Sequence, residues 1–139
     1  MSDDLDDDAL WTAFHERTLP AASWTHATHL RMAWMHLARY GLDEAHVLMR
    51  VGIIRLNAAH GLVETAQRGY HETITRVWLV LVAALKNVER GRDSRDFLEL
   101  HPGALTREAP LRHYSKTRLY GLSARSHFMD PDLDPLPHA

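Results

Sequence analysis

The chain has 139 residues, a formal net charge of −2 with histidine neutral, 11 histidines and no cysteine. Its length is typical of one domain, and with charges so nearly balanced neither a nucleic-acid-binding signature nor an anionic-membrane signature dominates the whole molecule. Without cysteine, the chain has no disulfide, no thiolate metal site and no cysteine nucleophile.

The first two predicted helices cover residues 4–18 and, after Ser23 or Thr25 as N-cap, the residues up to Gly41. Aspartates lie in the first turn of the first helix, where the helix dipole favours negative charge. A secretory signal would instead begin with basic and then apolar residues, so we expect a cytoplasmic protein.

The third and fourth predicted helices run from Asp43, as N-cap, to Gly61 and over residues 70–90. The fourth is apolar nearly all round, which predicts a central position in the fold. Its longest apolar run, residues 77–85, has nine residues, far fewer than the ~20 that a membrane-spanning helix needs. We therefore expect no membrane partner.

The remaining residues predict shorter pieces of structure. Ser94 is expected to cap a helix that ends at Leu100, and two more short helices are predicted at residues 111–120 and 123–128. Prolines then exclude a regular helix or a central strand over residues 130–137.

Strand signals are nearly absent, so these elements predict an all-α, single-domain fold. Residues 1–103 are expected to form an up-and-down four-helix bundle. Residues 104–139 are expected to form an ordered C-terminal arm of short helices and a proline-rich extended tail, packed on the bundle.

Four histidines are predicted to meet at one pole of this bundle. Short connections make successive helices antiparallel, so the start of the second, the end of the third and the start of the fourth helix share a pole. His26 and His29 lie at the first of these places, His60 at the second and His71 at the third. The spacing of His26 and His29 puts their Cβ atoms about 5–6 Å apart on one helix face.

The four histidines predict a mononuclear metal site. Imidazoles are common ligands of divalent transition metals, and helical bundles place such ligands on facing helices. The ion is expected to be Zn²⁺, Fe²⁺, Ni²⁺, Cu²⁺ or Mn²⁺, which ligand type alone does not rank. Glu72 adjoins His71 and is the candidate catalytic base, or an acceptor that orients an imidazole.

Taken alone, some of these residues also have a structural interpretation. His60 precedes Gly61 at a helix end that favours positive charge, and Glu72 lies in a first turn that favours negative charge. The metal-site prediction therefore depends on the convergence of all four histidines. The Glu-x-x-His, zincin, Gly-x-Ser-x-Gly, P-loop and Gly-x-Gly-x-x-Gly motifs are absent, so none of them indicates a particular reaction.

The most basic region, residues 107–125, lies in the predicted arm. If the arm crosses the histidine pole, Arg118 or Arg125 would hold a substrate carboxylate or phosphate, with Tyr114 and Ser115 as hydrogen-bonding partners. A solvated basic face is the alternative interpretation.

The strings T-H-A-T-H-L, N-A-A-H-G and G-Y-H-E-T, followed by D-P-D-L-D-P-L-P, resemble a family of small bacterial helical proteins with no known activity. The resemblance extends from about Trp24 to Pro137 and implies that these strings belong together. The three-histidine bundles of the DinB-like type, which include metal-dependent thiol transferases, are similar in concept, although their ligand pattern does not map onto this chain.

These inferences favour a metal-dependent enzyme that activates water or a substrate oxygen on a small polar molecule. An iron or copper enzyme that activates oxygen would use the same ligands. A non-enzymatic protein that binds a small molecule or a structural metal is the third interpretation. We expect no nucleic-acid partner, and the sequence does not determine the oligomeric state.

Overall fold

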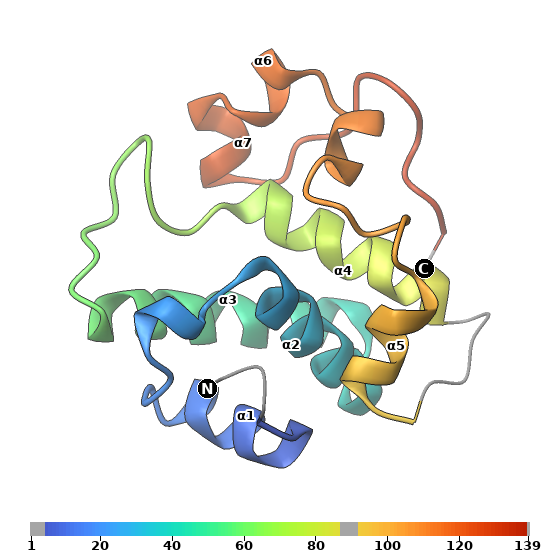
Figure 1. The fold of residues 1–139 in the computed structure, drawn as a ribbon. Coiled ribbons are helices and arrows are strands. Elements are labelled where there is room, and N and C mark those ends of the chain that lie inside the picture. Colours follow the sequence, from blue (N-terminus) through green and yellow to red (C-terminus); the bar gives the residue numbers. More distant parts are fainter. Residues whose placement is uncertain (1–4, 87–91, 139) are drawn as a thin grey trace.

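The computed structural model describes residues 5–86 and 92–138, and every regular element in this part of the chain is helical (Figure 1). The longer helices are α1 (Asp7–His15), α2 (His26–Arg39), α3 (Leu42–Ala59) and α4 (Glu72–Lys86). The shorter elements are η2 (Ala21–Ser23), α5 (Ser94–Leu100), η3 (Ala109–Arg112), α6 (Lys116–Leu119) and α7 (Leu122–Ser126). The all-α prediction is confirmed for the described residues.

Side-chain caps explain where several helices begin. The Asp6 carboxylate accepts a hydrogen bond from the Ala9 N–H at 2.8 Å, and the Thr25 hydroxyl accepts one from the Thr28 N–H at 3.2 Å. Thr25 is therefore the N-cap of α2, one of the two residues that the sequence predicted for this role. Two other predicted caps are wrong: Gly41 precedes α3, and Asp93 caps α5.

The predicted helix over residues 111–120 is also wrong. The chain forms the 3-10 turn η3, then an irregular stretch at His113 and Tyr114, and only then α6. Ser115 interrupts the helix, because its hydroxyl caps α6 through the Arg118 N–H at 3.2 Å while its own N–H donates to Asp132 at 2.8 Å. The predicted end of the fourth helix at residue 90 lies outside the described residues.

The helices pack around α4. Helices α2, α3 and α4 pack against one another, and α1 packs on α2 and α3 (Figure 1). Helix α5 packs on α2, whereas η3 and α7 pack on α4. Helix α4 is thus covered on two sides, which is the reason that apolar residues occupy most of its circumference.

The main apolar core lies between α1, α2, α3 and α4, with Phe97 of α5 also buried in it. Phe14, Met32, Met49 and Leu79 are completely or almost completely buried there. Gly52 permits the close approach of α1 to α3, because a Cβ atom at this position would lie 2.3 Å from the Phe14 ring. A smaller cluster of Val77, Tyr114 and Leu119 fixes the C-terminal segment to the outer side of α4.

No helix in the described part of the chain is long and apolar enough to cross a membrane.

Candidate functional site

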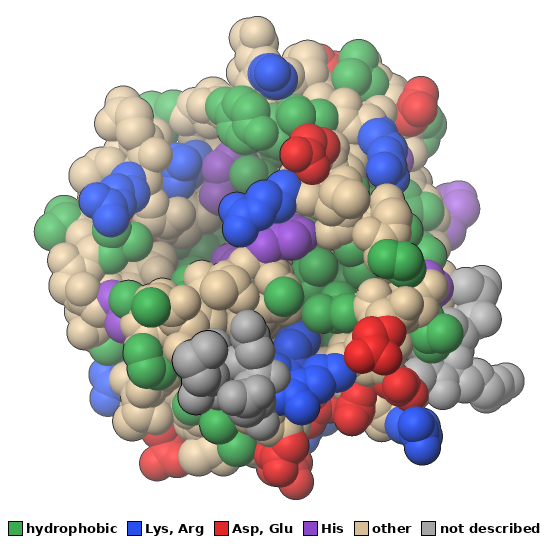
Figure 2. All heavy atoms as spheres, in the orientation of Figure 1, with side chains coloured by type: hydrophobic (Ala, Val, Ile, Leu, Met, Phe, Trp, Pro, Cys, Tyr) green, Lys and Arg blue, Asp and Glu red, His purple; other side chains and the backbone are tan. Residues whose placement is uncertain are grey.

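A cavity of about 410 Å³ lies where the start of α2, the second half of α3 and the start of α4 meet. We call it the pole cavity. It is lined by Trp24, His29, Ile53, Asn57, Leu62, Gly69, Tyr70, His71, Ile74, Thr75, Trp78, Tyr120 and Arg125. The sequence analysis placed His29 and His71 at the starts of two different helices, and both side chains line this one cavity. Figure 2 shows histidine side chains near the centre of one face, among hydrophobic, lysine and arginine side chains.

His71 uses both ring nitrogens within the fold. Its Nε2–H donates to the Leu119 carbonyl oxygen at 2.8 Å, and its Nδ1 accepts from the Ile74 N–H at 3.1 Å. The second bond satisfies a free N–H in the first turn of α4, as an N-cap side chain would. Burial lowers the pKa of His71, so the neutral ring that this pattern requires is favoured.

His26 and His60 hold other loops in the same way. The Nε2–H of His26 donates to the Leu105 carbonyl oxygen at 2.8 Å, and that of His60 donates to the Leu19 carbonyl oxygen at 2.7 Å. The His26 ring also packs edge-on against Trp78, with ring centres 4.9 Å apart. Three of the four predicted ligands therefore bind backbone carbonyls of distant segments through Nε2.

His29 differs from the other three histidines. Its ring packs on Trp24, with ring centres 4.2 Å apart, and lines the pole cavity. Neither ring nitrogen has a hydrogen-bond partner among the described residues. Burial, with a smaller contribution from His26, lowers the pKa of His29 to about 4. At neutral pH the ring is therefore uncharged and offers the cavity one N–H donor and one lone pair.

Asn57 is a second polar group at this cavity, and the sequence analysis missed it. Its side chain is buried within α3, and its amide has no hydrogen-bond partner in residues 5–86 and 92–138. An amide without a protein partner at a cavity wall is available to a ligand or to ordered water. The available signal was its position four residues after Ile53, on the inward face of α3.

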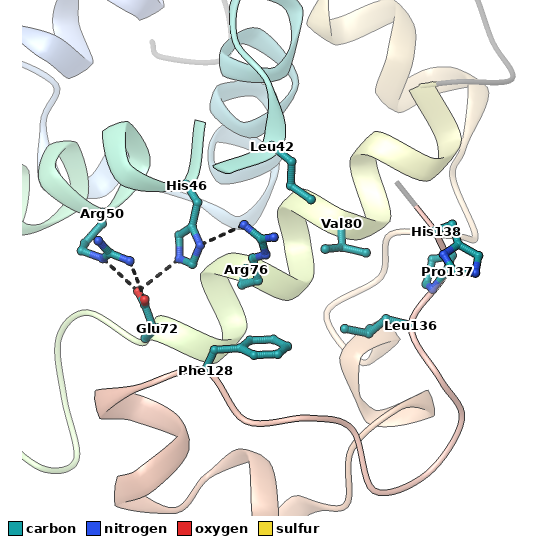
Figure 3. A pocket seen from close by; sticks show the side chains of 10 residues that line it. All are labelled: Leu42, His46, Arg50, Glu72, Arg76, Val80, Phe128, Leu136, Pro137 and His138. Carbon is teal, nitrogen blue, oxygen red and sulfur yellow. Dashed lines mark hydrogen bonds and ion pairs between the residues drawn. The ribbon is translucent and has the colours of Figure 1, made fainter. Parts of the chain in front are cut away.

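Glu72, the predicted catalytic base, lies outside the pole cavity, in an ion-pair network that we call the Glu72 cluster (Figure 3). Arg50 donates to both carboxylate oxygens, at 3.0 and 2.5 Å. Tyr70 donates its hydroxyl at 2.6 Å, and His46 donates Nε2–H at 3.1 Å. The Glu72 cluster comprises these four residues and joins α3 to α4.

The charge of Glu72 is held constant over a wide pH range. Burial by itself would raise the pKa of this carboxyl, but hydrogen bonds from Arg50 and Tyr70, with the nearby charge, lower it to about 2. A general base works best with a pKa near the working pH. The geometry therefore gives the predicted role of Glu72 no support and assigns it to holding two helices together.

Only one of the three predicted substrate-binding residues in the arm borders the pole cavity. Arg125 lines it, but its guanidinium donates to the carbonyl oxygens of Gly69 at 3.1 Å and Tyr70 at 3.2 Å. Arg118 donates to the Asp130 carbonyl at 2.6 Å, and Tyr114 is buried and donates to the Met129 carbonyl at 2.6 Å. Arg125 thus fastens the loop before α4 onto α7.

Comparison of the chain with protein-family models, with curated protein sequences and with solved structures found no match. Its function is therefore inferred from the geometry of the site.

The donor set does not fit a metal ion as it stands. Among residues 5–86 and 92–138, no three histidine, cysteine, aspartate or glutamate side chains are grouped so that they could hold one. Ligation by His26, His60 or His71 through Nε2 would also require breaking its bond to a backbone carbonyl. The metal site stays a prediction of the sequence, and we derive no chemical step from it.

Proposed function

We propose that this chain is a small-molecule-binding protein whose ligand occupies the pole cavity and forms hydrogen bonds with His29 and Asn57. One observation carries the proposal: His29 is the member of the predicted histidine set that lines the cavity with both ring nitrogens free of partners among the described residues. A volume of about 410 Å³ lies within the range that small-molecule sites have in proteins.

The lining favours a flat, uncharged ligand. Trp24, Tyr70, Trp78 and Tyr120 supply aromatic surface, against which rings pack in stacked or edge-on arrangements. Apart from Arg125 the lining is apolar, aromatic or neutral, and the Arg125 guanidinium already donates to three backbone carbonyls, so the desolvation of a ligand charge here would be only partly compensated. We therefore infer a neutral aromatic or heteroaromatic ligand with an N–H or O–H for the lone pair of His29.

Binding is a better-supported function than the metal-dependent enzyme that the sequence suggested. Both interpretations use the same histidine strings, but among the described residues the predicted ligands other than His29 already bond to backbone carbonyls, which leaves His29 and Asn57 as polar groups available at the cavity. We also interpret α1 to α4 as an up-and-down four-helix bundle that carries residues 104–139 as an arm. Support for this comes from the mutual packing of α2, α3 and α4 and from the contacts of η3 and α7 with α4.

The proposal is tested with neutral heteroaromatic fragments. Indole, benzimidazole and nicotinamide are titrated into the protein while the NMR signals of the Asn57 side-chain amide and of the Leu62 and Tyr70 backbones are followed. We expect at least one fragment to bind with a Kd on the order of 1 mM, as befits so few atoms. Benzoate should bind more weakly to the pole cavity, because its charge would be desolvated.

The decisive variant is His29→Phe, which keeps an aromatic ring on Trp24 but removes both nitrogens. It should weaken fragment binding by about tenfold, the equivalent of one or two hydrogen bonds. His127→Phe is the matched control, because His127 is exposed and does not line the cavity. Equal affinity in His29→Phe and the unmodified protein, or no binding of any fragment, would overturn the proposal.

A further inference from the structure

A second pocket, of about 440 Å³, lies between the start of α3, the first half of α4 and the C-terminal tail (Figure 3). We call it the tail pocket. Its walls include the apolar side chains of Leu42, Val80, Phe128 and Leu136, and its polar side carries Arg50 and Arg76. It shares no lining residue with the pole cavity, so its chemistry is independent of the function proposed above.

Arg50 is not free to recognise a ligand. Its guanidinium forms a two-point contact with the Glu72 carboxylate, whose charge it neutralises. His46 adds no charge near neutral pH, because burial lowers its pKa despite the neighbouring Glu72. The charged group of the tail pocket that remains is Arg76.

Arg76 has one weak anionic partner. Its Nη1 lies 2.9 Å from the Asp43 carboxylate, whose side chain is 93% exposed, and 3.4 Å from the Nδ1 of His46. An ion pair with so exposed a partner contributes little stability, because water and salt screen it. The Arg76 charge is therefore only weakly compensated by Asp43 and can still attract a ligand carboxylate.

The other edge of the same guanidinium is available. The Nε and Nη2 atoms of Arg76 have no hydrogen-bond partner within the part of the chain that the structure describes. These two N–H groups are parallel and match the two oxygens of a carboxylate. Beside them, Val80 and Phe128 offer apolar surface to the rest of a ligand.

We propose that the tail pocket binds a small monocarboxylic acid with an apolar body, its carboxylate on the Nε and Nη2 edge of Arg76 and its body against Val80, Phe128 and Leu136. A charged head and an apolar body are both needed to fill this lining. A simple inorganic anion would leave the apolar walls uncovered, and a neutral analogue would leave Arg76 with the screened Asp43 pair.

Hexanoate and its neutral analogue hexanamide are titrated into the full chain, and the NMR signals of Val80, Phe128 and Leu136 are followed. Hexanoate should bind with a Kd on the order of 1 mM, given its few atoms, and hexanamide at least tenfold more weakly. Arg76→Gln should weaken hexanoate binding at least tenfold. Asp43→Asn should strengthen it severalfold, because it removes the negative charge beside Arg76 that repels a ligand carboxylate.

Arg55→Gln is the matched control, because Arg55 is exposed on α3 and does not line the tail pocket. It should leave hexanoate binding unchanged, as should His29→Phe, which alters only the pole cavity. Equal binding of hexanoate and hexanamide would overturn the proposal, and so would unchanged binding in a folded Arg76→Gln variant. If Arg76→Gln fails to fold, weaker binding in Asp43→Asn would overturn it on its own.

Discussion

The pole cavity and the Glu72 cluster include neighbouring residues of the chain, at positions 70–72. They differ in whether their polar side chains have hydrogen-bond partners within the fold. In the cluster, Arg50, Tyr70 and His46 all direct donors to one carboxylate. At the cavity, His29 and Asn57 have no such partners among the described residues. Saturated polar groups hold elements together, whereas unsatisfied ones beside a cavity are available to bind. In our proposal, the Glu72 cluster serves stability and the pole cavity serves ligand binding.

The largest expected difference between the two regions is in the pH dependence of stability, because each region loses its contribution to the free energy of unfolding in a different pH range. The pKa of His29 is about 4 in the fold, below the ordinary 6.5, so the unfolded chain binds more protons between these values. Stability should therefore fall as the pH drops from 6.5 to 4. His36 is fully buried, and burial lowers its pKa to about 4 as well. Its contribution to the free energy of unfolding, on the order of 3 kcal/mol, is therefore lost in the same pH range.

The Glu72 cluster should lose its contribution at lower pH. The pKa of Glu72 falls from the ordinary 4.5 to about 2 in the fold. The stability that this carboxylate contributes is therefore complete above pH 4.5 and is lost as the pH falls toward 2. Urea unfolding at a series of pH values measures both ranges. His29→Phe should reduce the loss of stability in the upper range, to which His36 still contributes, and Glu72→Gln should reduce the loss in the lower range. The comparison would be contradicted if His29→Phe changed the lower pH range and Glu72→Gln the upper one.

Glu72→Gln at neutral pH should have the next largest effect. The amide keeps the size of the side chain but leaves Arg50 without its charged partner and weakens the bond from Tyr70. Hydrogen bonds to charged groups are the stronger ones, and Arg50 is 37% exposed, so we expect a loss of about 2 kcal/mol in the free energy of unfolding. Fragment binding in the pole cavity should persist. A variant that keeps full stability but loses binding would show that the two regions are not divided as described.

The smallest effects come from the two histidines that share the cavity. His71→Ala removes a cap from α4 and the bond to Leu119, and should cost about 1–2 kcal/mol. His29→Phe should change stability by less than about 1 kcal/mol at neutral pH, because it removes no hydrogen bond within the described fold. Chemical denaturation of both variants, with amide hydrogen exchange at Ile74, checks the contrast. A larger loss in His29→Phe than in His71→Ala would contradict it.

The sequence predicted the helices better than it predicted their ends. Apolar periodicity located α1 to α4, because burial of one face requires it whatever the loops do. Asp43 was wrongly predicted as a cap because two residues, Tyr40 and Gly41, already complete the turn between α2 and α3. The break at Ser115 depends on Asp132, which is distant in the chain and leaves no local signal.

The candidate site was predictable in position but not in bonding. The helix order was enough to bring His29 and His71 to one cavity, because it places the start of α2 beside the start of α4. The partners of His26, His60 and His71 are carbonyl oxygens of three leucines. Every residue carries such an oxygen, so no residue type in the sequence marks it as an acceptor.

The bonds of His71 make the first turn of α4 the point at which protonation must disturb the fold. His26 and His60 each donate one N–H to a carbonyl, and an imidazolium can still make that bond. His71 donates from one nitrogen and accepts at the other, and an added proton would set its Nδ1–H against the N–H of Ile74. Two donors then face each other where an acceptor is required. Protonation of His71 would therefore disturb the turn that borders the pole cavity, so acidity and ligand occupancy act on the same few peptide groups.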